Sequence, residues 1–147
     1  MKTTGLKRMI EMKISVHKRK EKTMGKQHWK PGNMLNPVPA VMVSVTDKEG
    51  KSNIITVAWA GTICSDPAMV SISVRKERYS HDIIKETGEF VINLVNKRLV
   101  RATDYCGVKS GRDVDKFAET RLTPQASRYV KAPGIEESPV NIECKVT

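Results

Sequence analysis

The sequence predicts a mainly β domain, an antiparallel barrel or sandwich with a few helices filling its ends. Three observations support this prediction. Strand-like runs such as AVMVSVTD (40–47) are separated by short turns that contain glycine or proline. No repeated alternation of strands and helices follows, which argues against a doubly wound parallel sheet. The last nine residues, PVNIECKVT, alternate apolar and polar side chains as a half-buried antiparallel strand does.

The first predicted strands form a hairpin and one further strand. The run 40–47 enters the turn DKEGK, where Gly50 suits a positive φ, and SNIITVAWAGTI (52–63) follows as the second strand. Asp66-Pro67 ends that run, because proline fixes φ and lacks the N–H that a central strand uses. MVSISV (69–74) is then the third strand.

Two helices, a short helical turn and two further strands are predicted in the second half of the chain. Ser80 is a candidate N-cap for a helix at 81–87, with Gly88 just past its end. A second helix, again stopped by glycine, is predicted at 96–107. The other predictions are a strand at 89–95, a polar loop at 108–117 that leads into a short helical turn, loop structure at 123–139 and a strand at 139–147.

Length and cysteine usage predict one cytoplasmic domain. A chain of 147 residues suits a single domain with a sizeable core, and it has no apolar run of the roughly 18 residues that a spanning helix needs. No secretory signal is evident, and no membrane partner is expected. The three cysteines, Cys64, Cys106 and Cys144, lie far apart and are expected to be reduced thiols.

The net charge of +10 is concentrated at the N-terminus. Residues 1–23 carry eight lysines and arginines against two glutamates, whereas the remaining 124 residues carry a net charge of only +4. We therefore predict a basic, disordered extension at 1–23 and a folded domain at 24–147, whose residues 24–39 form an irregular lead-in. The extension could contact nucleic acid, although the folded part gives no reason to expect this.

The sequence contains no recognisable catalytic side-chain set. His17, His28 and His81 have no Ser or Cys partner at a known spacing, and no group of residues has the spacing of a metal site. There is no Walker loop, and no GxGxxG follows a strand. We therefore predict neither a catalytic acid or base nor a bound metal.

One stretch, TVAWAGTICSDPAMVSISVRKERYS (56–80), combines features of a ligand site. Small residues beside Trp59 would let a ligand approach the backbone. Cations and the predicted helix start at Ser80 follow the next strand, and arginine beside a helix N-terminus suits phosphate. The stretch therefore suits a flat ring with a phosphorylated tail. An ordinary hairpin with a bulge, followed by a solvated RKER loop, is the alternative.

At these residues the sequence resembles the flavin reductase-like, FMN-binding split-barrel family, and in particular its flavoredoxin branch. The resemblance runs from NPVPAVMVSVTDKEG to GEFVINLV and continues through ATDYCGVKSGRDVDKFAETRLTP and APGIEESPVNIECKV. It covers residues 33–146 and implies an antiparallel split barrel that forms a homodimer and binds FMN.

The resemblance also implies the residues that would contact FMN. The isoalloxazine ring and ribityl chain would lie along Trp59, Ala60, Gly61, Thr62, Ile63, Cys64 and Ser65. The ring edge and the phosphate end would be approached by Ser73, Val74, Arg75 and Lys76, and the phosphate would be closed over by Arg78, Tyr79 and Ser80. Ser110 and Gly111 would serve either a flavin of the other subunit or a nicotinamide.

The implied function is an FMN-binding oxidoreductase or electron-transfer flavoprotein. Electrons would come from NAD(P)H or a protein donor and pass to free flavin, a redox protein partner or a metal centre. Because the cofactor performs the redox step, a chain without catalytic side chains is consistent with this function. Alternatives are a non-redox binding module on the same fold, with the basic tail on nucleic acid, and an inactive fragment.

The chain departs from the resemblance at its C-terminus. Family members usually continue for several strands beyond IECKV, whereas this chain stops at Thr147. We therefore expect a domain that is truncated at its C-terminus, with exposed strand edges where the missing part would pack.

Overall fold

The computed structural model describes residues 14–17 and 26–147, and the chain divides into two units, Met1–Pro37 and Val38–Thr147. In the first unit, β1 (Ile14–His17) pairs antiparallel with β2 (Lys26–Trp29). The prediction that 24–39 is irregular is therefore wrong at 26–29, because the backbone there forms a strand that hydrogen-bonds to β1. The rest of the predicted basic extension, and its contact with nucleic acid, lies outside the described residues.

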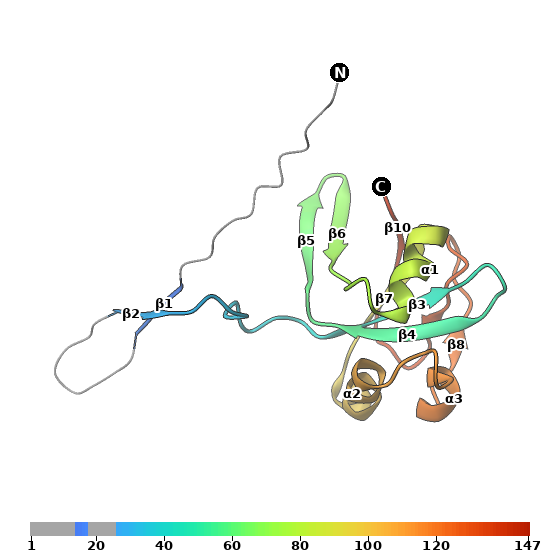
Figure 1. The fold of residues 1–147 in the computed structure, drawn as a ribbon. Helices are drawn as coiled ribbons and strands as arrows, with labels where there is room; N and C mark the ends of the chain where they lie inside the picture. Colours follow the sequence, from blue (N-terminus) through green and yellow to red (C-terminus); the bar gives the residue numbers. More distant parts are fainter. Residues whose placement is uncertain (1–13, 18–25) are drawn as a thin grey trace, which may run out of the picture. The chain divides into compact units, whose positions relative to one another are not determined.

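A four-stranded antiparallel sheet forms the centre of the second unit (Figure 1). Its strands, in spatial order, are β10 (Asn141–Lys145), β7 (Glu89–Leu94), β3 (Val41–Thr46) and β4 (Ser52–Val57). The predicted strands at 40–47, 89–95 and 139–147 are thus confirmed, as is the hairpin between the first two runs. The mainly β, antiparallel fold class is confirmed with them.

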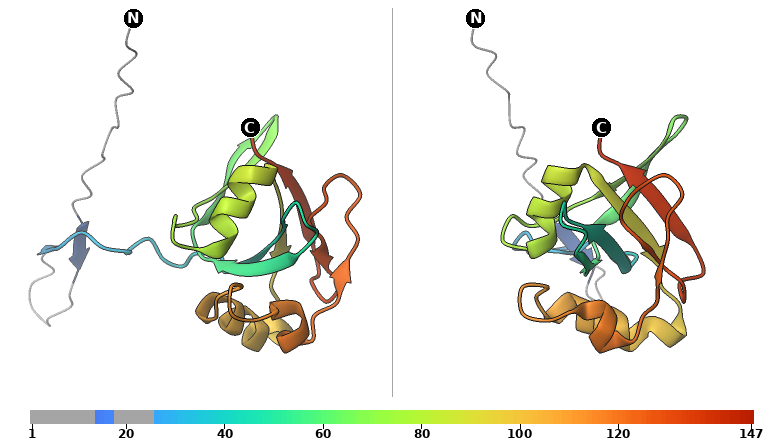
Figure 2. Two further views of the ribbon diagram at one scale, coloured as in Figure 1. Left: turned by 45° about the vertical axis from the view of Figure 1, so that its right-hand side comes forward. Right: turned by 90° about the vertical axis from the view of Figure 1, so that its right-hand side faces the viewer.

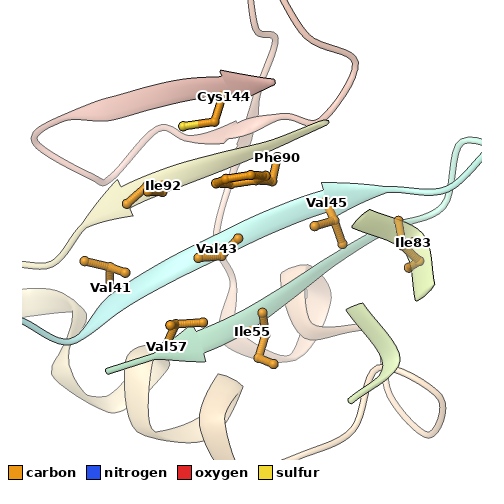
Figure 3. Packing of buried hydrophobic residues seen from close by; sticks show 9 residues of the cluster. All are labelled: Val41, Val43, Val45, Ile55, Val57, Ile83, Phe90, Ile92 and Cys144. Atoms are coloured by element: carbon orange, nitrogen blue, oxygen red, sulfur yellow. The ribbon is translucent and has the colours of Figure 1, made fainter. Parts of the chain in front are cut away.

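Strand β3 is buried on both faces, which explains its nearly continuous apolar sequence. On one face Val43 lies opposite Ile55 of β4 and Ile92 of β7, and Figure 3 shows these side chains packed together. The residues of this core cluster are Val41, Val43, Val45, Ile55, Val57, Ile83, Phe90, Ile92 and Cys144. On the other face Met42 and Ile54 pack in a second cluster with Leu99, Cys106, Phe117, Leu122 and Ile135.

Helices cover the two faces of the sheet separately (Figure 2). Helix α1 (Tyr79–Thr87) packs on the first face through Ile83. The other face carries η1 (Lys97–Leu99), α2 (Val100–Val108) and α3 (Lys116–Thr120). None of the described helices has the length and apolar character needed to span a bilayer.

The predicted strand 52–63 is in fact two strands. The chain leaves β4 at Val57, and β5 (Ala60–Ser65) pairs with β6 (Ala68–Ile72) as a separate hairpin that turns at Asp66-Pro67. The carbonyl of Trp59 accepts a hydrogen bond from the N–H of Ser73, so it extends this hairpin and not the main sheet. A register shift between Thr62 and Cys64 matches the bulge foreseen in the alternative interpretation.

The predicted helix ends need two corrections. Arg78, not Ser80, is the N-cap of α1, because Ser80 lies inside the first turn, where its buried hydroxyl accepts a hydrogen bond from Asn53. Helix α2 continues through Gly107 to Val108, since Gly107 packs closely against the Thr56 side chain instead of ending the helix. The segment predicted as loop also contains the short pair β8 (Pro124–Gln125) and β9 (Gly134–Ile135).

Gly88 ends α1 as predicted and should be sensitive to substitution. Its φ is +67°, while a Cβ there would meet no atom within 4 Å, so Gly88→Ala adds backbone strain without a clash. We expect a loss of about 1 kcal/mol in unfolding free energy, measured by urea denaturation. Gly61→Ala is the matched control, because that site is equally open and has no positive φ. Equal stability of the two variants would contradict the strain argument.

Candidate anion-binding pocket

A pocket of about 130 Å³ lies between the N-terminal end of α1 and the loop that follows α2. Its walls come from β4, the segment before α1, the end of α2, the loop 109–112 and the start of α3. The lining residues are Asn53, Ile55, Glu77, Arg78, Tyr79, Ser80, Cys106, Gly107, Lys109, Ser110, Gly111, Arg112 and Lys116. Four cationic side chains against one carboxylate make this pocket a candidate site for an anion.

The start of α1 adds hydrogen-bond donors to these charges. The first N–H groups of a helix have no intrahelical acceptor and carry a partial positive charge. Here they belong to the turn at Tyr79 and Ser80, and Ser80 is 1% exposed. The Ser80 hydroxyl accepts from Nδ2 of Asn53 at 2.9 Å, so its own hydrogen is left for another acceptor.

Arg112 closes the pocket from the loop after α2. Its guanidinium lies 5.3 Å from the centroid of the Tyr79 ring, and Nη1 donates to the carbonyl oxygen of Glu77 at 3.2 Å. Lys51 approaches the same ring at 5.7 Å. These contacts tie the loop 109–112 to the segment 77–79, although the two are about thirty residues apart in sequence.

Lys116 and Cys106 form the buried floor of the pocket. Lys116 is 3% exposed, and its Nζ donates to the carbonyl oxygens of Ile54 at 2.7 Å and Cys106 at 2.8 Å. Burial lowers the pKa of the Lys116 ammonium; Cys106 opposes this shift and the charge of Arg78 adds to it. Burial likewise raises the pKa of the Cys106 thiol to about 11, against the effect of Lys116.

Trp59 and Arg75 lie next to this pocket along the chain. The Arg75 guanidinium is 5.5 Å from the centroid of the Trp59 ring, and the Ser73 N–H donates to the Trp59 carbonyl at 2.8 Å. A turn follows in which the Arg78 N–H donates to the Arg75 carbonyl at 3.0 Å. Trp59, Arg75 and the start of α1 are thus linked through this ring contact and these two backbone hydrogen bonds.

The structure divides the residues predicted from the sequence into three groups. Arg78, Tyr79, Ser80, Ser110 and Gly111 line the anion pocket together. Trp59, Ser73 and Arg75 contact one another outside the lining of that pocket, with Ala60, Gly61, Ile63, Val74 and Lys76 beside them in the chain. Thr62, Cys64 and Ser65 line a different hollow of about 450 Å³, together with Phe90, Ile142 and Cys144.

Sequence reasoning missed several pocket residues. Asn53 and Lys116 are buried polar side chains whose role depends on packing between distant elements. Arg112 follows Ser110 and Gly111 directly, so a loop rich in small and basic residues (VKSGRD) was the available signal for it. No set of three His, Cys, Asp or Glu side chains within the described ranges could hold a metal ion.

Comparison with known proteins gives one consistent result. The family described as "Flavin reductase like domain" matches residues 34–147. An uncharacterised protein of Archaeoglobus fulgidus is 33% identical over 96 residues, which are 65% of this chain and 54% of that protein. An uncharacterised protein of Aquifex aeolicus is 33% identical over 118 residues, 77% of this chain and 60% of its own length. The chain thus spans just over half the length of these relatives.

Solved structures resemble the chain in the same way. Flavoredoxin of Desulfovibrio vulgaris (Miyazaki F) is 39% identical with a TM-score of 0.74, covering 78% of this chain and 63% of that one. Flavoredoxin from Methanosarcina acetivorans is 30% identical with a TM-score of 0.69, covering 81% of this chain and 63% of that one. These similarities agree with the antiparallel sheet.

Proposed function

The chain belongs to the flavin reductase-like domain family, and from this premise we propose that it binds FMN and transfers electrons through it. The observation that carries the proposal is the anion pocket at the start of α1, which follows the paired Trp59 and Arg75 side chains within one stretch of the chain. FMN presents a phosphate at one end and a flat aromatic ring at the other, and the proposal assigns the phosphate to the pocket and the ring to the segment around Trp59. The similarity to two flavoredoxins supports the same ligand.

The residues present fit such a ligand. Arg78 and the first N–H groups of α1 would hold the phosphate, with Tyr79, Ser80, Ser110 and Gly111 around it. The ring would lie along 59–65 and 73–76, where a Cβ added at Gly61 would meet no protein atom within 4 Å. That open backbone leaves room for a flat ring to approach.

The redox chemistry would be supplied by FMN itself when bound, as acceptance and release of a hydride or of single electrons. The chain contributes binding, orientation and charge. Arg75 rests on the Trp59 ring at 5.5 Å, which holds a positive charge at the edge of the predicted ring site. Positive charge there would stabilise a reduced, anionic flavin. The proposal therefore assigns no side chain as acid or base.

The finer parts of this function are also proposals. The electron donor would be NAD(P)H or a protein, and the chain would act either as a flavin reductase or as an electron carrier. The assembly that completes the site would be a homodimer, as the resemblance implies. A reductase should oxidise NAD(P)H repeatedly when free flavin is added, whereas a carrier should hold FMN tightly and oxidise NAD(P)H slowly.

A visible absorption spectrum tests the proposal directly. The purified chain is incubated with FMN and separated from free ligand, and we expect it to retain a flavin spectrum that bleaches on reduction by NAD(P)H or dithionite. Circular dichroism on the same sample reports the fold. A folded protein that retains no flavin would overturn the proposal for this chain, and the experiment would then be repeated on a full-length relative.

A further inference from the structure

Lys116 is unusual because its charge is buried without a carboxylate. It is 3% exposed at the first residue of α3, where Phe117 packs into the core and draws the helix onto β4. Within the described ranges, no Asp or Glu oxygen lies within 4.0 Å of its ammonium group. Burial of a cation is costly unless partners compensate for the lost hydration.

The protein compensates Lys116 only in part. Its ammonium carries three N–H donors, and two of them reach the carbonyl oxygens of Ile54 and Cys106. The third has no hydrogen-bond acceptor among the described residues, although the side chain lines the anion pocket. The nearby charge of Arg78 repels the ammonium further, as the direction of its effect on the Lys116 pKa shows.

We propose that Lys116 is a phosphate-binding residue of this pocket, whose third N–H and buried charge select a doubly charged phosphate monoester. Arg78 and Lys116 then approach one anion from the rim and the floor, and the bound phosphate relieves the repulsion between them. The inference rests on the proposed function for the identity of the ligand as FMN. It stands without that function for phosphate as a chemical class.

The alternative is a structural role, in which Lys116 only joins β4 to the end of α2. The two roles differ in one measurable ratio, the affinity for FMN divided by that for riboflavin, which lacks the phosphate. For Lys116→Met we expect the FMN affinity to fall at least tenfold and the riboflavin affinity to change less than about threefold. Titrations followed by tryptophan and flavin fluorescence give the dissociation constants for FMN and for riboflavin. An unchanged ratio would assign Lys116 to structure alone.

Lys109→Met is the matched control, because Lys109 lines the same pocket but is exposed. The proposal gives Lys109 no hydrogen bond to the phosphate, so its exposed charge acts only at longer range and is screened by salt; we expect a loss of FMN affinity below about fivefold that disappears in high salt. The loss in Lys116→Met should persist in high salt, since a buried charge is screened much less. Equal salt dependence in the two variants would overturn the inference.

A pH series on the unmodified chain keeps the inference testable if Lys116→Met does not fold. Burial lowers the pKa of Lys116, so its charge is lost at a lower pH than that of an exposed lysine. The FMN to riboflavin ratio should therefore fall as pH rises from neutral toward the range where lysines titrate. The phosphate is already a dianion there, since its second pKa is about 6. A flat ratio would contradict the role.

Other groups facing Lys116 are controlled in the same series. They are Glu77, Arg78, Tyr79, Cys106, Lys109 and Arg112. The Tyr79 phenol is controlled by repeating the series in Tyr79→Phe, where the fall in the ratio should remain. Arginine stays charged in this range, and the pKa of Cys106, at about 11, lies above it. Repeating the series in Lys109→Met removes the exposed lysine, and the fall in the ratio should remain. Its disappearance would assign the effect to Lys109.

Inorganic phosphate separates failure of this inference from failure of the proposed function. We expect phosphate to raise the melting temperature of the unmodified chain relative to chloride at equal ionic strength, and Lys116→Met to abolish that rise. This result without FMN binding would support the inference and reject the proposed function. If the chain binds FMN but Lys116→Met leaves the ratio of FMN to riboflavin affinity unchanged, the proposed function would be supported and the inference about Lys116 rejected.

Discussion

Replacing Arg78 with alanine is expected to weaken FMN binding tenfold or more while leaving riboflavin binding nearly unchanged. The guanidinium lines the pocket that would receive the phosphate, and a hydrogen bond to a charged group contributes roughly 1.5–3 kcal/mol. Each 1.4 kcal/mol corresponds to about tenfold in affinity. The proposed ring contacts along 59–65 would not involve Arg78, so the two flavins should respond differently.

The fold should tolerate this change. Arg78 is the N-cap of α1, but its side chain makes no capping hydrogen bond, so alanine removes none. It is also exposed, and none of the three ion pairs between described residues involves it. We therefore expect an unfolding free energy within about 0.5 kcal/mol of the unmodified chain.

The measurement is a fluorescence titration of each variant with FMN and with riboflavin. Arg101→Ala is the matched control, because Arg101 is an exposed arginine on α2 outside the pocket lining. It should bind both flavins as the unmodified chain does. If Arg78→Ala weakened the binding of FMN and riboflavin equally, Arg78 would contact the ring or position the β5–β6 hairpin. The phosphate would then have to lie elsewhere.

The strands of the main sheet were predictable because each is a short run of apolar or alternating residues bounded by turn residues. In β10, Cys144 is buried while the neighbouring Lys145 is exposed, which is the alternation visible in the sequence. β3 is buried on both faces, yet its length and β-branched residues still identify it as a strand. Local chemistry determines such elements, so the sequence is enough to place them.

The split between β4 and β5 was not predictable in this way. The run 52–63 has continuous β propensity, and nothing within it marks the change of sheet at Ala58 and Trp59. The change depends on which strand each half pairs with, β3 for one and β6 for the other. Pairing partners are tertiary information, so a single run can serve two sheets.

The pocket shows the same limit. Arg78, Tyr79 and Ser80 were predicted from a basic segment at a helix start, and the resemblance added Ser110 and Gly111. Lys116 could not be predicted, because a lysine beside exposed acidic residues in DVDKF has the pattern of a solvated face. Only the packing of α3 against β4 buries it. Buried charges of this kind are found from structure and then suggest function.

Gly111→Ala is expected to destabilise the chain and to damage the pocket at the same time. A Cβ at this position would lie 2.2 Å from Oδ1 and 2.5 Å from Cγ of Asn53, which is 3% exposed. Asn53 cannot move freely, because its Nδ2 donates to the Ser80 hydroxyl at 2.9 Å. Relief of the clash must therefore displace either the loop 109–112 or the start of α1.

We expect Gly111→Ala to lose about 1–3 kcal/mol of unfolding free energy, as overpacked interiors do, and to weaken FMN at least tenfold. Urea denaturation and flavin titration measure the two losses. Gly61→Ala separates them, because its Cβ meets no protein atom within 4 Å. That variant should keep its stability within about 0.5 kcal/mol. Gly61→Ala should still weaken the binding of both FMN and riboflavin if the ring lies against this backbone.

A double substitution identifies the cause of the Gly111→Ala loss. Asn53→Ala alone removes the hydrogen bond to Ser80 and should destabilise the chain by about 1 kcal/mol. It also removes the atoms that the new Cβ would strike, so the two changes together should cost clearly less than their sum. Strict additivity would show that the loop after α2 resists alanine for a reason other than Asn53. The link from Gly111 through Asn53 to Ser80 at the start of α1 would then not hold the pocket together.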